Sequence, residues 1–265
     1  MSKHLIFSFL LLSLFSCKKI PDTINNINGG EIEVLSHAGE NQLHPWNSFP
    51  SIEKAMKNGA DGVEVDVQVS NDSVLVLYHE AYLDIKTKGE PGRVEALSWD
   101  SLKQIEYKRS SHTLIHLDSV INGFDDIQIS LDLKPYTDSF STKYIPYLVE
   151  VIARYNRIYG IEDMYIESTS KTLLKSLYLS NNNYQLFYYT NHIDSCIELG
   201  KRINLTGISI KDDLITQEDV EKAHDHQLKV MVWDIYNANA NNKNILKHVD
   251  IIQTDALKHL VNQVK

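Results

Sequence analysis

The sequence contains very little cysteine. Only Cys17 and Cys196 occur in 265 residues, and Cys17 lies in a segment that we expect to be processed. A disulfide needs two thiols in the same folded unit, so no intramolecular disulfide is expected. A lone cysteine of this kind is more often a small packing residue than a nucleophile, and we assign Cys196 no chemical role.

Positive charge is also scarce. The chain has 26 Lys and Arg residues against 35 Asp and Glu residues, a formal charge of −9. Nucleic acids are bound mainly through basic surfaces, so this balance argues against a nucleic-acid partner and against steering onto anionic lipid. An anionic substrate would need a bound cation or a local Lys or Arg to offset the charge.

Long apolar runs are absent. The longest, residues 5–15, is too short to span a bilayer, but after Lys3 it suits the apolar part of a signal peptide. It ends in the residues L-F-S-C, which resemble a bacterial lipoprotein cleavage box. We therefore expect residues 1–16 to be a lipoprotein signal peptide and Cys17 to be lipidated, anchoring the protein in the bacterial cell envelope. An ordinary signal peptide or an unprocessed anchor is the alternative.

Composition divides the rest of the chain into two parts. Residues 17–30 are rich in Asn, Gly and Asp without an apolar period, which is typical of a tether. Residues 31–265 show no internal repeat or low-complexity tract. With 43% hydrophobic and 23% charged residues in the whole chain, they are expected to form one folded domain.

Residues 61–80 contain the most informative pattern. Valines alternate with polar residues between positions 63 and 69, which predicts a strand. Glu64 and Asp66 then point to the same face, roughly 7 Å apart. Two such carboxylates favour a hard cation such as Mg²⁺ or Ca²⁺. A second apolar run ends at His79, next to this pair. The alternative is a polar surface strand followed by a loop histidine.

Further along, strands alternate regularly with helices, which indicates parallel β/α units. About eight such units favour a single-domain α/β fold, the (β/α)₈ TIM barrel. Strands are expected near residues 32–35, 61–69, 74–78, 127–135, 164–167, 185–189, 207–210, 229–235 and 250–253. Helices are expected near residues 47–59, 98–105, 115–122, 141–155, 171–179, 193–202, 217–226, 243–247 and 256–264.

In such a barrel the active site lies at the carboxyl ends of the strands. Several residues with chemical potential fall at or near these ends: His37, Glu64, Asp66, His79, Asp132, Lys134 and Trp233. The alternatives are a loop role for His37, a structural ion pair between Asp132 and Lys134, and a core position for Trp233. The remaining histidines, among them His44 and His112, are assigned no role.

The order of short motifs resembles the glycerophosphodiester phosphodiesterase family, one of the phospholipase-C-like phosphodiesterase barrels. The resemblance covers residues 34–260. The motifs are His37-Ala38-Gly39, Pro45-Trp46-Asn47-Ser48, Gly59-Ala60-Asp61, Glu64-Val65-Asp66, His79-Glu80, Asp132-Leu133-Lys134, Val232-Trp233 and Gln253-Thr254-Asp255. Each motif is weak alone, but their order and spacing make the match strong.

Three positions depart from the family pattern. Ala38 stands where the family has an Arg that helps to hold the substrate phosphate, and Trp46 stands where it has a Glu. Asp132 replaces the usual third Glu, which keeps a hard oxygen ligand. Loss of a guanidinium removes charge-assisted hydrogen bonds to phosphate, so a different affinity or substrate preference is expected.

The resemblance implies a metal-dependent phosphodiesterase. Glu64, Asp66 and Asp132 would hold a divalent cation, Ca²⁺ or Mg²⁺, and Lys134 would bind the substrate phosphate. His37 and His79 would serve as acid and base in an order that the sequence leaves open, and Trp233 would form a pocket wall. In this family a neighbouring substrate hydroxyl attacks first, and water opens the cyclic phosphate.

Two other functions stay open at this point. One is a phospholipase-D-like or sphingomyelinase-D-like enzyme acting on intact lipids. The other is a lipoprotein that binds a phosphate-bearing ligand without turnover, which Ala38 and Trp46 would favour.

Overall fold

The structure is a computed structural model that describes residues 23–134 and 144–265. The expected signal peptide, the lipidation site Cys17 and the first part of the expected tether lie outside the described residues. Within the described part, Asn26 and Asn28 donate side-chain hydrogen bonds to the backbone oxygens of Val249 (3.1 Å) and Asp250 (3.1 Å). Contacts with the folded domain therefore begin inside the segment expected to be a tether.

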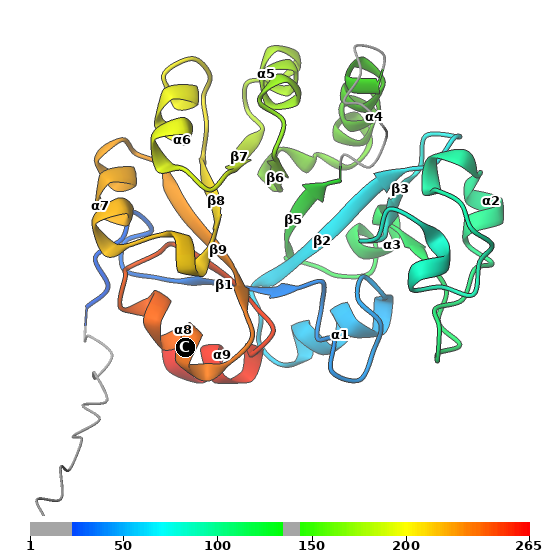
Figure 1. The fold of residues 1–265 in the computed structure, drawn as a ribbon, viewed down its shortest axis with the longest axis horizontal. Coiled ribbons are helices and arrows are strands. Elements are labelled where there is room, and N and C mark those ends of the chain that lie inside the picture. Colours follow the sequence, from blue (N-terminus) through cyan, green and yellow to red (C-terminus); the bar gives the residue numbers. More distant parts are fainter. Residues whose placement is uncertain (1–22, 135–143) are drawn as a thin grey trace, which may run out of the picture.

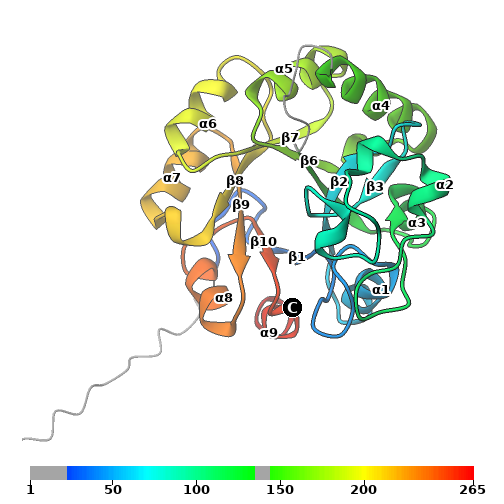
Figure 2. The same cartoon turned by 45° about the vertical axis from the view of Figure 1, so that its right-hand side comes forward.

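Eight parallel strands form a closed barrel, which confirms the predicted fold class. Each strand pairs with the next, and β1 pairs with both β10 and β2, which closes the ring. Figure 2 shows these strands around the centre with the helices outside. The strands are β1 (Glu33–His37), β2 (Gly62–Val69), β5 (Gln128–Leu133), β6 (Tyr165–Ser168), β7 (Gln185–Tyr189), β8 (Gly207–Lys211), β9 (Lys229–Ile235) and β10 (Ile251–Thr254).

A helix follows each barrel strand and covers its outer face (Figure 1). At α7, the Thr216 side chain accepts from the backbone N–H of Asp219 while Asp219 accepts from that of Thr216, a reciprocal cap. The helices are α1 (Phe49–Lys57), α3 (Leu117–Ile121), α4 (Tyr144–Tyr159), α5 (Lys171–Ser180), α6 (Ile193–Gly200), α7 (Gln217–Asp225), α8 (Ala238–Ile245) and α9 (Leu257–Val264). Among the described residues, no helix combines the length and the apolar character needed to cross a membrane.

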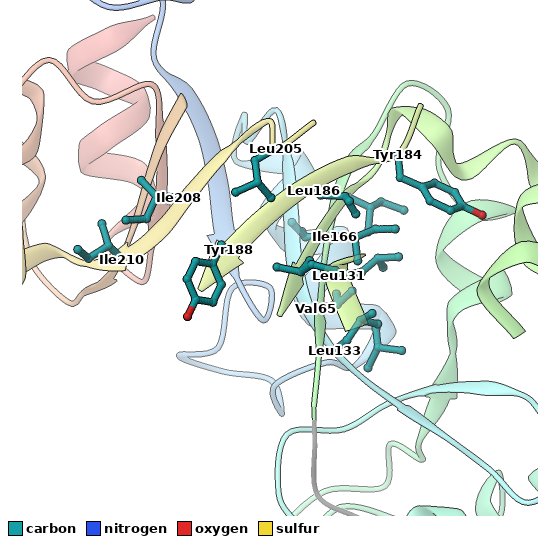
Figure 3. Packing of buried hydrophobic residues seen from close by; sticks show 14 of the residues in the cluster. Val65, Leu131, Leu133, Ile166, Tyr184, Leu186, Tyr188, Leu205, Ile208 and Ile210 are labelled. Atoms are coloured by element: carbon teal, nitrogen blue, oxygen red, sulfur yellow. The ribbon is translucent and has the colours of Figure 1, made fainter. Parts of the chain in front are cut away.

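The main core lies between the barrel and its helices. Alternate strand residues such as Val65, Leu131 and Ile166 point outward into this layer, where they pack together (Figure 3). Cys196 is buried in the same layer, in keeping with a packing role. Because side chains alternate along a strand, the residues between these outward positions point into the barrel.

A second set of apolar side chains fills the barrel interior, one layer below the carboxyl ends of the strands. These residues are Leu35, Tyr165, Phe187, Met231 and Ile251. The residues two positions further along the same strands face the same interior: His37, Glu167, Tyr189, Trp233 and Gln253. The two-residue period of the strands therefore places a polar layer directly above an apolar plug.

Residues 75–116 interrupt the β/α alternation between β2 and α3, and we call them the insertion. The insertion contains β3 (Leu75–Leu77), η1 (Leu83–Ile85), η2 (Val94–Ala96), α2 (Trp99–Leu102) and β4 (Ile115–His116), and α2 lies at the right of Figure 1. It has a small apolar core of its own, which includes Tyr78, Leu83 and Leu102. The helix expected at residues 115–122 was wrong in its first turn, because Ile115 and His116 pair with β3 as a strand.

Candidate active site

Strand register brings the predicted carboxylates together. His37 on β1 is paired with Glu64 on β2. Two residues further along β2, Asp66 is paired with Asp132 on β5, and Asp132 is paired with Glu167 on β6. Parallel strands in register carry such residues on one face of the sheet, so side chains that lie far apart in the sequence meet inside the barrel.

Three of these residues form a compact acidic cluster. One carboxylate oxygen from each of Glu64, Asp66 and Asp132 lies within 4.8 Å of the other two, and all three residues are buried. The Lys134 ammonium lies 2.8 Å from Asp66 Oδ1 and also contacts Asp132 Oδ2. The structure thus joins the predicted metal ligands and the predicted phosphate-binding lysine in one place.

The charges of this cluster do not balance. Burial and the neighbouring Asp66 raise the pKa of Glu64 well above its usual range. Burial raises the pKa of Asp132 too, although Lys134 opposes the shift. Burial would also raise the pKa of Asp66, but Lys134 and His79 hold it below its usual value. A bound cation would relieve the remaining repulsion.

The turn after β1 fixes two of the carboxylates. The backbone N–H of Ala38 donates to Glu64 Oε2 (3.2 Å), and Asn47 Nδ2 donates to Asp66 Oδ2 (2.6 Å) while its Oδ1 accepts from the Asp66 backbone (3.0 Å). Gly39 permits this turn, because its φ is +82° and a Cβ there would lie 2.4 Å from Ser51 Oγ. The turn therefore holds one oxygen of Glu64 and one of Asp66 in place.

The two predicted histidines line the same pocket as the carboxylates. The rings of His37 and His79 each contact the Trp46 ring, at centroid distances of 5.5 and 5.7 Å. Trp46, one of the departures from the family pattern, therefore packs between the two imidazoles. In their contacts with other side chains, however, the two histidines differ.

His37 is held by a carboxylate outside the acidic cluster. Its Nδ1 lies 3.1 Å from Asp255 Oδ1, and its Nε2 lies 3.9 Å from Glu64 Oε2. Burial lowers the pKa of His37, but Asp255, Glu64 and Asp66 outweigh burial and raise it to about 9. His79 Nδ1, in contrast, lies 3.6 Å from Glu80 Oε1 and has no hydrogen-bond partner among the described residues.

The remaining wall combines the predicted Trp233 with Glu167 and Tyr189, which the sequence analysis did not single out, and with Gln253, which it named only within a motif. The pocket has a volume of about 80 Å³ and is also lined by Glu167, Tyr189, Trp233 and Gln253. The indole ring of Trp233 packs against Tyr189 at 5.1 Å, so this residue faces the pocket as expected. Glu167 accepts hydrogen bonds from Ser130 Oγ (2.6 Å) and Gln253 Nε2 (2.5 Å). Burial and Asp132 raise its pKa to about 7.

The donor set fits a divalent cation. All three clustered ligands offer carboxylate oxygens, which hard cations such as Mg²⁺ and Ca²⁺ prefer. Their mutual distances allow one ion to contact all three. A cation bound there would oppose the effect of burial, which raises the pKa of Glu64 and of Asp132, because it favours their charged forms.

Curated relatives support the family resemblance over part of the chain. A glycerophosphodiester phosphodiesterase from Caldanaerobacter subterraneus is 36% identical over 73 residues, which is 28% of this chain and 30% of the relative. Human glycerophosphodiester phosphodiesterase 1 is 31% identical over 100 residues, 37% of this chain and 30% of the relative. The chain thus matches less than a third of the length of these relatives.

Solved structures support the fold over most of the chain. A phosphodiesterase from Oleispira antarctica in complex with the product sn-glycerol-3-phosphate superposes with a TM-score of 0.78 at 19% identity, covering 88% of this chain and 96% of the other. A glycerophosphodiester phosphodiesterase from Parabacteroides distasonis gives a TM-score of 0.72 at 20% identity over 88% and 96% of the two chains. At these identities the likeness establishes the barrel architecture.

The family model covers nearly the whole folded domain. The model of the glycerophosphoryl diester phosphodiesterase family matches residues 37–259, from the first pocket histidine to the last helix. Together with the site geometry and the barrel, this match shows that the chain belongs to the glycerophosphoryl diester phosphodiesterase family.

Proposed function

We propose that the protein is a metal-dependent phosphodiesterase that hydrolyses glycerophosphodiesters to an alcohol and glycerol phosphate. The observation that carries this proposal is the single pocket in which two imidazoles, three clustered carboxylates and one lysine meet. The family match supports the substrate class. Such chemistry needs charge neutralisation at the phosphate, a base for the attacking hydroxyl and an acid for the leaving alkoxide.

In this proposal Glu64, Asp66 and Asp132 hold a divalent cation. When bound, the cation polarises the phosphoryl oxygens and neutralises their charge. Asn47 and the backbone of Ala38 keep two of the ligands oriented, since they hydrogen bond to Asp66 and Glu64. Such supporting contacts fix ligand geometry before substrate arrives.

Lys134 and the two histidines act on the substrate itself. Lys134 directs its ammonium into the pocket and adds a positive charge beside the phosphate. His37, oriented by Asp255, and His79 hold or donate the protons of the attacking and leaving oxygens. Because only His37 has a carboxylate within hydrogen-bond distance, Asp255→Asn should affect His37 and leave His79 unaffected.

A turnover assay tests the proposal. Purified protein is incubated with glycerophosphocholine and glycerophosphoglycerol in the presence of Ca²⁺, Mg²⁺ or Mn²⁺, and released glycerol phosphate is measured. Metal-dependent release that disappears in the double variant His37→Gln/His79→Gln is the expected result. No release with any metal, together with binding of the diester that survives the double variant, would contradict the proposal.

We also propose that the protein is lipid-anchored in the cell envelope through Cys17. The supporting observation is the apolar run that ends in L-F-S-C at residues 14–17. Labelling with a fatty-acid analogue in a bacterial host should mark the full chain and leave the Cys17→Ser variant unmarked. A labelled Cys17→Ser variant, or an unlabelled full chain, would contradict this proposal.

A further inference from the structure

A second and much larger cavity adjoins the proposed metal site. It has a volume of about 740 Å³ and lies between residues 41–47, which follow β1, and the insertion. His79 lines both cavities, and Trp46, which contacts His37, lines the larger one. A substituent on a phosphate bound at the acidic cluster would therefore enter this space past His79.

The larger cavity is basic, although the chain as a whole is acidic. Lys86, Lys108 and Arg109 line it, and Glu80 is the only acidic residue among its lining residues. The formal charge of the whole chain is −9. A concentration of cations in this one hollow attracts anions locally, since a concave wall of one sign strengthens its own field.

Carbonyl oxygens hold the ammonium of Lys108, and side chains surround that of Lys86. The Lys108 ammonium donates to the carbonyl oxygens of Asp84 and Ile85 (3.3 Å to Ile85), and the Lys108 backbone N–H donates to the carbonyl oxygen of Lys86 (2.8 Å). Carbonyl oxygens orient an ammonium but do not cancel its charge. The Lys86 ammonium lies 4.0 Å from Glu80 Oε1 and 5.8 Å from the centre of the Trp46 ring, which in turn contacts both His37 and His79.

Arg109 resembles Lys108 and differs from Lys86, whose ammonium has a carboxylate neighbour. Its backbone has a φ of +61°, a conformation that non-glycine residues rarely adopt. No carboxylate of residues 23–134 or 144–265 forms an ion pair with it. Strained backbone of this kind is often kept at ligand-binding positions, and an unpaired guanidinium offers a forked set of donors that matches carboxylate and phosphate oxygens.

We propose that the larger cavity receives the headgroup alcohol of the phosphodiester and selects headgroups that carry a further anionic group. The inference rests on the proposed function, because it takes the substrate to be a glycerophosphodiester. In such substrates the glycerol is constant and neutral, whereas the headgroup varies and can carry charge. The polar residues Asn41, Gln42 and Ser110 line the cavity together with the cations, beside apolar residues such as Leu43 and Ile85. Carboxylate and phosphate share the chemistry that Arg109 and the two lysines recognise.

Matched substrate pairs test the inference. The ratio of kcat/KM for glycerophosphoinositol 4-phosphate to that for glycerophosphoinositol measures selection of a phosphate, and the ratio for glycerophosphoglycerate to glycerophosphoglycerol measures selection of a carboxylate. Both ratios should exceed one in the native protein. In Arg109→Gln at least one should fall by about 10- to 100-fold, the range expected for a lost charge-assisted hydrogen bond.

The control is Arg157→Gln, since Arg157 is exposed in the last turn of α4, outside the cavity. This variant should leave both ratios unchanged. Ratios near one in the native protein, or equal losses on charged and neutral headgroups in Arg109→Gln, would overturn the inference while leaving the phosphodiesterase activity established.

Calorimetry keeps the inference testable if no substrate turns over. Native protein should bind inositol 4-phosphate more tightly than inositol, and Arg109→Gln should reduce that preference by a similar factor. Equal binding of the two probes by the native protein would contradict the inference. Absence of turnover with preferential binding would instead count against the proposed function alone.

Discussion

The barrel and the insertion build adjacent cavities in different ways. In the barrel, the polar side chains come from strands whose two-residue period and register bring Asp66, Asp132 and Glu167 into one row. In the insertion, the cavity-lining cations come from irregular backbone, where Lys108 is held by carbonyl oxygens and Arg109 has a left-handed conformation. His79, just after β3, lines both cavities.

The difference indicates a division of tasks. The acidic cluster depends on the barrel strands, because its side chains project from the paired strands β2 and β5. The insertion has a separate small core, so its surface residues can change without moving the acidic cluster. Loops on a rigid scaffold commonly carry specificity in this way. We therefore expect changes at the barrel, and at His79 where the insertion meets it, to abolish turnover. Changes elsewhere in the insertion should alter substrate preference or local stability.

The largest effect is expected from Asp66→Asn. Under the proposed function this change removes a buried metal ligand, which costs several kcal/mol of transition-state stabilisation, so kcat/KM should fall roughly 10⁴-fold. The exposed Asp100, in α2 of the insertion, supplies the matched control: Asp100→Asn should leave kcat/KM unchanged. Saturating Mg²⁺ or Ca²⁺ should raise the melting temperature of the native protein and not that of Asp66→Asn. Full activity in Asp66→Asn would show that the acidic cluster is not the reaction centre.

The next largest effect is expected at the histidines. His37→Gln and His79→Gln should each lower kcat by roughly 10²- to 10⁴-fold, the usual contribution of a positioned acid or base. Asp255→Asn should cause a smaller loss that is not additive with His37→Gln, because Asp255 acts through that ring. Steady-state kinetics of the single and double variants measure this, with the exposed His192→Gln as control. Additive losses would show that Asp255 acts independently of His37.

The sequence predicted the barrel part of this comparison well. Regular alternation placed Glu64 and Asp66 on one face, and the position of strand ends added Asp132 and Lys134. Glu167 was not singled out, because β6 is short and offers no second carboxylate two residues away. Glu167 could have been proposed as a site residue from its position at the carboxyl end of the strand predicted near residues 164–167. Asn47 was named only within a motif of the family resemblance, since no local pattern reveals that its amide reaches Asp66 nineteen residues away.

The insertion could not be predicted to the same degree. Secondary structure is predicted mainly from the periodic spacing of apolar residues, and the segments that carry the cations of the insertion show no such spacing. No helix or strand was therefore expected between residues 78 and 98 or between residues 105 and 115, and Lys86, Lys108 and Arg109 were assigned no role. The spacing of apolar residues at 115–122 fits either a helix or a short strand followed by a helix. Pairing of Ile115 with Leu77, which lies 38 positions earlier, decides between these alternatives.

Core truncations should separate the two regions by stability. Leu131→Ala in the main core should lower the free energy of unfolding of the whole domain by about 2–5 kcal/mol. Leu102→Ala in the core of the insertion should chiefly allow local opening, because that core is small and separate. Chemical denaturation measures the first effect, and amide hydrogen exchange should show lost protection confined to residues 75–116 for the second. Equal loss of protection throughout the barrel in Leu102→Ala would show that the two regions unfold together.

The smallest effect is expected at Asp118, which joins the end of the insertion to α4. Its carboxylate accepts from the hydroxyls of Tyr155 (2.8 Å) and Tyr159 (2.6 Å), and His116 Nδ1 lies 3.2 Å away. Burial alone would raise the pKa of Asp118, but His116, Tyr159 and Tyr155 lower it well below its usual range. A carboxyl group whose pKa is lowered on folding contributes stability at neutral pH, and this contribution is lost as the pH falls below its unfolded value of about 4.

Asp118→Asn should therefore lower the free energy of unfolding by about 1–2 kcal/mol at pH 7, the range for hydrogen bonds to a charged group after allowance for partial exposure. The difference from the native protein should shrink as the pH falls from about 4 towards 2, because the Asp118 carboxyl of the unfolded chain then takes up a proton while the folded one, with its lowered pKa, stays ionised. Denaturation curves at several pH values measure this difference. If the difference in free energy of unfolding stays constant down to pH 2, the charge of Asp118 does not contribute to the contact between residues 116–118 and α4. That contact would then be stabilised by uncharged packing, as the core of the barrel is.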